Sequence, residues 1–469
     1  MTFGQGVDHA LNVYEKRPAE AGFFVGHFAG FARCGESFVT CGMRKLGLGA
    51  STALVTGNMI GSGIFLLPAG LVVYGNLGMI GWCCASLGAV LLAAVFRQLG
   101  SLYPDAPGGP YAYVRRAFGD LPGFAVAWGY WVSIWCTNAA IAVACVGYLG
   151  VFFPALTAHA WAAALSGVGL IVVFTAVNSA GLRKMAVVQT VTTVLKVVPL
   201  LVVGGLGIVY VDVDALWRAG TYEGGMLAGI TSATTLTLFA FLGVESAAIS
   251  SARIRNPQQN MGRASLWGTL LTVVVYLLGT VAVIGALPPE ALAQSGAPFA
   301  DAAGVFLGDF ARPVMAGAAV MATMGALNGW LFIQGEFPMA VAEDGLFPLV
   351  FARRNRAGIP LVGLAISSVL ACAVLLFRFS DSLVETFTFM MTLSTLSALV
   401  PYLLSALALR RFLRGKPGQW RARGLGTVAA VFCVWVIFGC GGEVLLFGGT
   451  LLGVGLVLHA MRTAIRNRP

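Results

Sequence analysis

The chain has 469 residues, of which 58% are hydrophobic and only 10% are charged, and its mean hydropathy is +0.85. Soluble domains carry about 25% charged residues, so this composition excludes an ordinary soluble protein and indicates one that crosses a membrane many times. The formal net charge is +10, and the position of the basic residues along the chain is more informative than that total.

The residue types that usually carry chemistry are sparse. The nine cysteines and four histidines show no metal-binding or catalytic spacing, and there is no GxxxxGK[ST] nucleotide-binding sequence. We therefore expect no metal, no cofactor, no enzymatic activity, no nucleic-acid partner and no ATP-driven pump.

The first 46 residues differ from the rest of the chain. They are mixed and polar, and they lack the apolar region and the small-residue cleavage site of a signal peptide. We interpret residues 1–46 as a cytoplasmic tail or an over-extended start.

The first hydrophobic segment, 47–73, is long enough to cross a bilayer, but Gly57, Gly61 and Gly63 lie at its middle. Glycine weakens a helix by about 1 kcal/mol relative to alanine. Irregular backbone at membrane depth is tolerated only inside protein or beside a water-filled cavity. The segment therefore predicts a broken helix that lines a binding site near the bilayer midplane.

A span needs about 20 apolar residues, and that length divides the chain into twelve spans. Their predicted ranges are 47–73, 77–99, 123–153, 157–180, 185–211, 226–250, 264–287, 313–341, 359–378, 383–409, 424–441 and 444–461. With the N-terminus placed inside, all but four of the 29 basic residues fall at the inner ends of these spans. Because Lys and Arg collect in cytoplasmic loops, this asymmetry predicts that both termini are cytoplasmic.

A second interruption, from Phe239 to Ser246, lies in the sixth span, five spans after the first. Corresponding breaks in two halves indicate an inverted repeat with the binding site between them. We therefore predict an all-α membrane protein. Its parts are a first repeat at 47–211, a second repeat at 226–409, two peripheral helices at 424–461 and a cytoplasmic tail at 462–469.

Several motifs resemble those of one transporter superfamily. They are Gly57-Asn58-Met59-Ile60-Gly61-Ser62-Gly63-Ile64-Phe65-Leu66-Leu67-Pro68, Gly108-Gly109-Pro110-Tyr111-Ala112-Tyr113, Gly243-Val244-Glu245-Ser246, Glu343-Asp344-Gly345-Leu346-Phe347-Pro348 and Val400-Pro401-Tyr402. Over residues 47–460 the chain resembles the amino acid–polyamine–organocation (APC) superfamily. Within it, the chain is most similar to the basic amino acid/polyamine antiporters of the arginine/agmatine type.

The resemblance implies ten core helices, two peripheral helices that often form a homodimer, and alternating access around a central site. The positions that it implies bind substrate are Asn58, Ile60, Gly61, Ser62, Gly63, Ser133, Asn138, Phe239, Leu242, Trp330 and Ser394. The aromatic residues that it implies gate or line the site are Tyr130, Phe387 and Tyr402. Physical chemistry agrees, since an exposed helix N-terminus suits a carboxylate and an aromatic face suits a cation.

Three positions depart from the arginine/agmatine pattern. Phe239 replaces a tryptophan, Lys196 replaces a small residue, and Glu336 replaces an amide. Charges inside a membrane cost about 2.5–3.5 kcal/mol on insertion scales, so each needs an explanation. Lys196 resembles the fifth-helix lysine of proton-coupled relatives. We hypothesise that Lys196, Glu245 and Glu336 couple protons to transport, with Glu336 approaching Lys196 or the first break.

Each of these assignments has a structural alternative. The first-span glycines could serve tight helix packing, and Trp330 and Phe239 could fill the core. Lys196 could extend to the membrane interface, Glu336 could pair with backbone or lysine, and Glu245 could cap a helix.

The sequence predicts an inner-membrane secondary transporter that exchanges a cationic amino acid or its decarboxylated amine. A proton-coupled amino acid symporter that uses Lys196 is the first alternative. A non-transporting membrane receptor is a remote one, because neither a soluble sensor domain nor a filter-like pore loop is present.

Overall fold

A computed structural model describes residues 46–104, 108–180, 199–249, 254–355, 358–379 and 382–466. Within these ranges the ordered elements are helices, with two isolated β-bridges at Leu46 and Gly75. The predicted N-terminal tail lies outside the described residues except for Leu46, and Lys196 also lies outside them.

The first span is broken where the glycines predicted it. Helix α3 (Leu48–Met59) ends at Ile60, whose backbone is extended with ψ at 90°. Helix α4 (Gly63–Leu71) then starts in a new direction and continues into η1 (Val72–Tyr74), so that the two halves are bent by 43°. The prediction of a broken first helix is confirmed.

The sixth span is also irregular at its centre. Helix α11 (Met226–Leu238) tightens into the 3₁₀ turn η4 (Phe239–Phe241) and resumes as the short helix α12 (Ser246–Ile249). Between them Leu242 is extended and Gly243 has φ at +106°, a left-handed conformation that glycine adopts without strain. The second predicted break is confirmed.

Helices lie in all twelve predicted ranges, although only residues 199–211 of the range 185–211 are described. The remaining helices in these ranges are α5 (Asn76–Leu102), α7 (Asp120–Leu149), α8 (Ala160–Ser179), α13 (Pro257–Ala286), α16 (Ala311–Glu343), α17 (Leu361–Phe377), α18 (Leu383–Phe412), α19 (Trp420–Phe438) and α20 (Gly442–Arg466). In the described part of the chain, nine helices are long and apolar enough to span a membrane, and the bent pair makes a tenth. Helix α17 and the segment Pro199–Tyr210 are shorter apolar helices.

Short elements connect these spans at the two ends of the molecule. They are α6 (Pro110–Phe118), η2 (Pro154–Leu156), η3 (Ile208–Tyr210), α10 (Val213–Leu216), α14 (Pro289–Gln294), α15 (Pro298–Leu307) and η6 (Leu349–Ala352). Several helix boundaries differ from the hydropathy prediction, and the start of α13 is an example. Helix α13 begins at Pro257 rather than at 264, since proline suits the first helical turn, where its missing N–H costs nothing.

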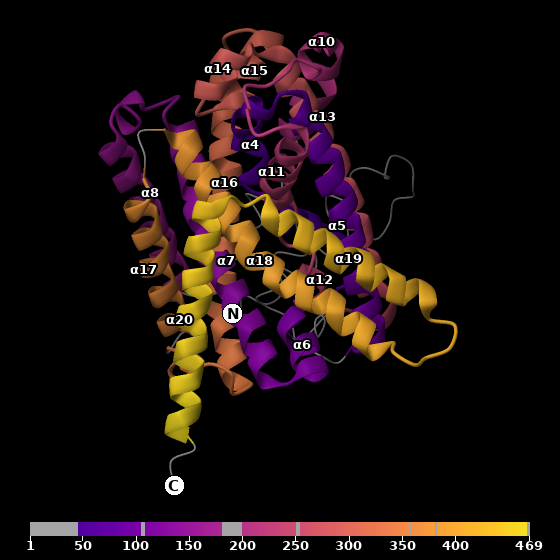
Figure 1. Cartoon of the computed structure of the whole chain (residues 1–469). Helices are drawn as coiled ribbons and strands as arrows, with labels where there is room; N and C mark the ends of the chain where they lie inside the picture. Colours follow the sequence, from indigo (N-terminus) through magenta and orange to yellow (C-terminus); the bar gives the residue numbers. More distant parts are fainter. Residues whose placement is uncertain are drawn as a thin grey trace, which may run out of the picture.

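The long helices pack in two groups (Figure 1). The broken helices α3, α4, α11 and α12 pack with α5 and α13, whereas α7, α8, α16 and α17 pack with one another. Helix α18 lies against α7 and α19, and α20 runs along the outside of the molecule. The two breaks therefore belong to one group of helices and face side chains from the other.

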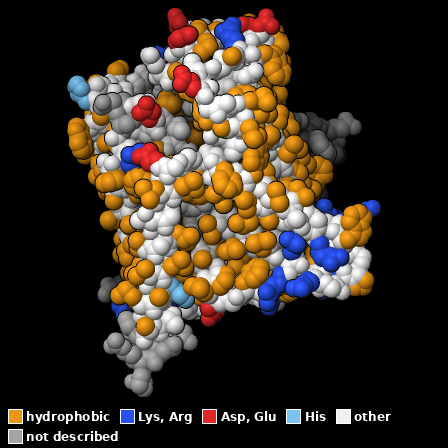
Figure 2. All heavy atoms as spheres, in the orientation of Figure 1, with side chains coloured by type: hydrophobic (Ala, Val, Ile, Leu, Met, Phe, Trp, Pro, Cys, Tyr) orange, Lys and Arg blue, Asp and Glu red, His pale blue; other side chains and the backbone are white. Residues whose placement is uncertain are grey.

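The two ends of the molecule carry different charges (Figure 2). Helices α10, α14 and α15 lie at one end, where Asp and Glu side chains gather. The opposite end carries α6 and the segment between α18 and α19, where Lys and Arg side chains gather. The surface between the ends is mainly hydrophobic, as expected for a protein surrounded by lipid.

Candidate functional site

The two breaks touch each other. Nδ2 of Asn58, at the end of α3, donates a 2.9 Å hydrogen bond to Oγ of Ser246, the first residue of α12. Gly63 faces the sixth span so closely that a Cβ at this position would lie 3.1 Å from Cα of Ala240. A Cβ at Gly243 would likewise lie 3.4 Å from Asn58. The glycines thus permit the contact between the breaks as well as the bend itself.

The start of α4 can bind an anion. The first N–H groups of a helix have no partner within the helix and lie at the positive end of its dipole. Gly61, Ser62 and Gly63 are buried here, and Ile60 is fully buried beside them. Oγ of Ser62 is also buried and has no hydrogen-bond partner among the described residues. This set of donors suits the carboxylate of an amino acid.

Two tyrosines hold the backbone on either side of the first break. The hydroxyl of Tyr276 on α13 donates to the carbonyl oxygen of Met59 at 2.5 Å. The hydroxyl of Tyr148 on α7 donates to the carbonyl oxygen of Phe65 at 2.7 Å. Both tyrosines are fully buried, so they satisfy carbonyl groups that could not otherwise reach water.

Buried aromatic side chains lie at the second break and on α16. Phe239 on η4 is 5% exposed and makes an edge-to-face contact with the fully buried Phe387 on α18, with ring centroids 6.3 Å apart. Trp330 on α16 is 6% exposed. Leu242, which follows Phe239 by three residues, donates its N–H to the Phe239 carbonyl at 3.0 Å.

A group of hydroxyls joins α7 to α18. Oγ of Ser394 donates to the carbonyl oxygen of Ser133 at 2.9 Å and lies 2.7 Å from Oγ1 of Thr137. Oγ of Ser133 donates to the carbonyl of Tyr130 at 2.8 Å. The predicted residues Ser133 and Ser394 are thus brought together in the buried interior.

A buried carboxyl group lies just beyond the second break. Glu245 is completely buried, and each of its oxygens accepts one tyrosine hydroxyl. Tyr130 on α7 donates to Oε1 at 2.6 Å, and Tyr402 on α18 donates to Oε2 at 2.7 Å. Glu245 lies in the turn before α12, Tyr130 lies on α7 and Tyr402 lies on α18, so the three side chains join both helix groups. We call them the carboxyl–tyrosine cluster.

An aromatic layer extends from this cluster toward α6. The ring of Tyr130 lies 4.9 Å from that of Phe337, which in turn lies 5.9 Å from the ring of Tyr111 on α6. The hydroxyl of Tyr111 donates to Oδ2 of Asp344 at 2.7 Å. Burial, together with that bond to Asp344, raises the pKa of Tyr111 well above 10.0, so the hydroxyl stays protonated as a donor. The layer separates the breaks from the α6 end of the molecule.

The interior of the second helix group is also polar. Asn138 on α7 is fully buried, and its Nδ2 donates to Oε1 of Gln334 on α16 at 2.7 Å. Gln334 is fully buried as well and was not predicted from the sequence as a site residue.

The structure leaves one predicted contact undescribed. Lys196 lies outside the described residues, so its proposed approach to Glu336 or to the first break is not visible. Glu336 is partly buried on α16, two residues after Gln334.

Residues that sequence analysis missed share one property: each is a single polar group in an apolar helix, paired with a residue far along the chain. They are Thr137, Tyr148, Tyr276 and Gln334. Their hydroxyl or amide groups lie in apolar segments, and that was the only available signal.

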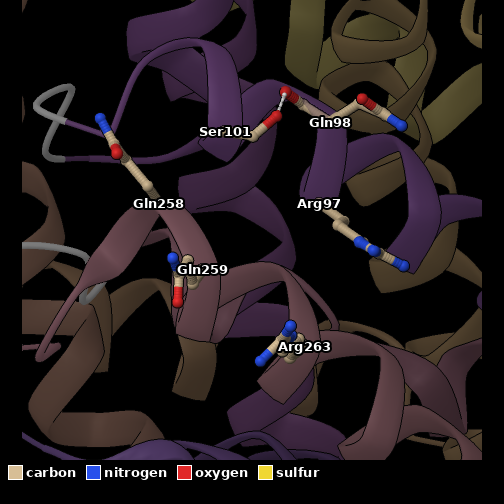
Figure 3. Close-up of a pocket in the computed structure, with 6 residues that line it drawn as sticks. All are labelled: Arg97, Gln98, Ser101, Gln258, Gln259 and Arg263. Carbon is tan, nitrogen blue, oxygen red and sulfur yellow. Dashed lines mark hydrogen bonds between the residues drawn. The ribbon is translucent and has the colours of Figure 1, made fainter.

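A surface hollow of about 250 Å³ lies away from the breaks, at the end of α5 and the start of α13 (Figure 3). It is lined by Arg97, Gln98, Ser101, Gln258, Gln259 and Arg263. Both arginines are exposed and would repel a cation, so this hollow does not suit a basic substrate.

No group of three or more histidine, cysteine or acidic side chains within the described ranges could hold a metal ion. The polar groups described around the breaks are hydroxyls, amides, backbone groups and the carboxyl of Glu245. They suit reversible binding of a small molecule.

Comparison with known proteins identifies the family. The amino acid permease family matches residues 46–455. The chain belongs to the amino acid permease family. This permease is 32% identical over 407 residues to a cadaverine/lysine antiporter of Escherichia coli strain K12, covering 84% of the chain and 90% of the relative. It is 30% identical over 437 residues to an arginine/ornithine antiporter of Pseudomonas aeruginosa, with 89% and 90% covered.

A third relative, the putrescine transporter PotE of Escherichia coli strain K12, is 29% identical over 428 residues, with 89% of the chain and 96% of the relative covered. The resemblance to the APC superfamily is therefore confirmed. The permease is a multi-pass membrane protein and a transporter, not an enzyme.

Proposed function

We propose that this permease is an antiporter that exchanges a cationic amino acid for another, or for its decarboxylated amine, by alternating access. The observation that carries the proposal is the contact between two broken helices, which gathers backbone dipoles, aromatic faces and hydroxyls at one buried place. Relatives that exchange lysine with cadaverine and arginine with ornithine support the substrate class.

The packing of the helices supports an inverted repeat. Helix α5 packs on α11 and α13 packs on α3, so the second helix of each half lies on the first helix of the other half. Helices α7 and α17 pack together, as do α16 and α8, so the third helix of each half lies on the fourth of the other. Such reciprocal packing is what two halves related by a two-fold axis would show.

We assign the two ends of the substrate to different parts of the site. The N-terminus of α4, from Gly61 to Gly63 together with Ser62, receives the carboxylate. The carbonyls at the second break, on Phe239 and Leu242, receive the α-ammonium. The aromatic face of Trp330 covers the cationic side chain, and such contacts contribute about 2 kcal/mol or more when they are desolvated.

Asn58 and the serines Ser133 and Ser394 supply the remaining polar contacts in this proposal. Asn58 is included because its hydrogen bond to Ser246 joins the two breaks. A substrate that moves the breaks apart or together would therefore change this bond. Phe387 packs on Phe239 and closes the aromatic side of the site.

The carboxyl–tyrosine cluster is the gate toward the α6 end. It joins α7 and α18 to the second break, and its hydrogen bonds are accompanied by the aromatic layer of Tyr130 and Phe337. Opening this end of the site requires that Glu245 part from at least one tyrosine. Both tyrosine hydroxyls bond Glu245 in this conformation, so we assign it to the closed state of the gate.

The charge distribution supports a topology of twelve spans in a bacterial inner membrane. The end that carries α6 and the basic segment between α18 and α19 faces the cytoplasm. We assign both termini to the same side of the membrane, from the distribution of basic residues along the sequence. Helices α19 and α20 are peripheral. Most of α20 is exposed at the surface of the described chain, and we assign its outer face to lipid and a homodimer contact.

Exchange by the purified protein in liposomes tests the function. Vesicles are loaded with lysine, ornithine, arginine, cadaverine or putrescine, and uptake of labelled lysine, ornithine and arginine is followed with and without a pH gradient. Exchange predicts uptake that requires a cationic internal substrate. Empty and alanine-loaded vesicles are the controls, and equal uptake into all vesicles would contradict the proposal.

The same assay separates the antiporter from a proton symporter. Uptake into empty, inside-alkaline vesicles that is lost in Lys196→Ala would establish symport, with Lys196 as the coupling residue. Exchange that persists in Lys196→Ala would support the antiporter and leave Glu245 and Glu336 as the candidates for proton coupling.

A further inference from the structure

Only one of the two polar atoms of the Asn138 amide is hydrogen-bonded among the described residues. Its Nδ2 is committed to Gln334, while its Oδ1 is buried and has no hydrogen-bond partner among the described residues. A buried acceptor without a partner costs about 1–3 kcal/mol in general, so its presence in a binding region indicates that a ligand supplies the missing donor.

The direction of the Asn138 amide follows from the contacts of Gln334 on the other side. Nε2 of Gln334 donates to Oγ of Ser368 at 2.8 Å and to the carbonyl oxygen of Leu364 at 3.3 Å. A carbonyl oxygen can only accept, so the NH₂ group of Gln334 must face α17. Its Oε1 then faces α7, and Asn138 must turn its NH₂ group toward it.

Ser368 is itself held in place, which completes the chain. Its hydroxyl donates to the Leu364 carbonyl at 2.8 Å and lies 2.8 Å from Oγ1 of Thr175 on α8. The orientation therefore passes from the backbone of α17 through Gln334 to Asn138. Four helices, α7, α8, α16 and α17, take part, and they pack as one group.

We propose that Gln334 is a positioning residue that turns the Asn138 amide so that its carbonyl oxygen, not its NH₂ group, faces the substrate. This rests on the proposed function, in which Asn138 lines the site. The free oxygen accepts from an N–H donor and therefore selects ammonium or guanidinium substrates. It disfavours a substrate that presents a carbonyl or carboxylate oxygen at the same place, because two acceptors would then meet without a proton. Gln334 lies one helical turn beyond Trp330, on the same side of α16.

The first test replaces Gln334 with methionine, which keeps the volume of the side chain and removes both hydrogen-bonding groups. Asn138 can then present either side of its amide. We expect the KM for exchange of lysine, ornithine and arginine to rise about 10-fold, as for the loss of one hydrogen bond to a charged group, with kcat changed by no more than about twofold. Inhibition by norleucine, which lacks the side-chain ammonium, should remain within about twofold.

The second test separates positioning from a structural role. In an Asn138→Asp background both side-chain oxygens are acceptors, so the orientation no longer matters. Adding Gln334→Met to Asn138→Asp should therefore leave the KM unchanged or lower it. The added substitution also removes Oε1 of Gln334, which would otherwise face the new carboxylate. A structural role for Gln334 predicts the same loss in both backgrounds, and that result would overturn the proposal.

A matched control comes from the neighbouring residue Ser367. Its Oγ accepts a bond from Nε1 of Trp131 at 2.7 Å and so joins α7 to α17. The same Oγ donates to the backbone carbonyl of Gln334 at 3.4 Å, a contact that does not involve the Gln334 amide or Asn138. Ser367→Ala should lower thermal stability and leave the KM unchanged. If wild-type protein exchanges the basic probes and Gln334→Met keeps its KM, the positioning role is wrong. If wild-type protein neither binds nor exchanges any of these probes, the proposed function fails and this inference with it.

Discussion

Replacing Tyr402 with phenylalanine tests the gate directly. The change removes one hydroxyl, which donates to Oε2 of Glu245 at 2.7 Å, and leaves the ring in place. Glu245 is 0% exposed, so no water replaces the lost donor without opening the site. A buried acceptor that loses its partner costs about 1–3 kcal/mol. Because each 1.4 kcal/mol is a factor of ten, the open form of the gate should become about 5- to 150-fold more populated.

Hydrogen exchange measures this population. A peptide that covers residues 239–249 reports on the second break and on α12. Its amides should exchange hydrogen faster by the same factor when the gate opens and closes rapidly compared with the exchange of an exposed amide. Tyr130→Phe removes the matching 2.6 Å bond to Oε1 and should have an effect of similar size. In liposomes, both variants should exchange substrate with altered kcat, since the balance between closed and open forms has moved.

The matched control for these variants is Tyr113→Phe. Tyr113 is fully buried on α6, and its hydroxyl has no hydrogen-bond partner among the described residues. Removing the Tyr113 hydroxyl should leave the rate of hydrogen exchange in residues 239–249 unchanged. Unchanged protection in Tyr402→Phe, or an equal change in Tyr113→Phe, would refute the assignment of the cluster as a gate.

Three further predictions concern the first break and the α6 end. Gly63→Ala places a Cβ 3.1 Å from Cα of Ala240 and should cost about 1–3 kcal/mol through overpacking, seen as a lower melting temperature together with lost exchange activity. Tyr276→Phe leaves the buried carbonyl of Met59 without its donor and should destabilise the protein by about 1–3 kcal/mol in thermal unfolding, whereas an unchanged midpoint would mean that water satisfies the carbonyl. Burial raises the pKa of Tyr111 above 10.0, so its contribution is fully present below pH 10 and falls only at higher pH; the difference in melting temperature between the wild type and Tyr111→Phe should therefore be constant from pH 6 to about pH 9.

The breaks were predictable because their cause is local. Glycines concentrated within one apolar segment weaken a helix wherever it lies, and the bend between α3 and α4 follows from them. The conformation of Gly243, with φ at +106°, has the same origin. The resemblance to a known superfamily then supplied site positions such as Trp330 and Asn138, which no local pattern would have distinguished from core residues.

Helix ends were less predictable, because hydropathy does not register caps. Helix α13 starts at Pro257 and α18 continues to Phe412, beyond the apolar ranges, since polar residues can extend a helix past the membrane interface. Helix α17, with 17 residues, is instead shorter than the predicted range 359–378, because Pro360 lies at its N-cap and Arg378 at its C-cap.

The sequence by itself determined the number of apolar segments, the two interruptions, the uneven distribution of charge and the family. Each of these depends on residues close together in the chain or on overall composition. Only the tertiary structure decided which polar groups meet. Tyr130 and Tyr402 are 115 and 157 residues away from Glu245, and Asn138 is 196 residues away from Gln334. Such pairs form because buried polar groups must find partners wherever packing brings the helices together, and one sequence carries no record of that proximity.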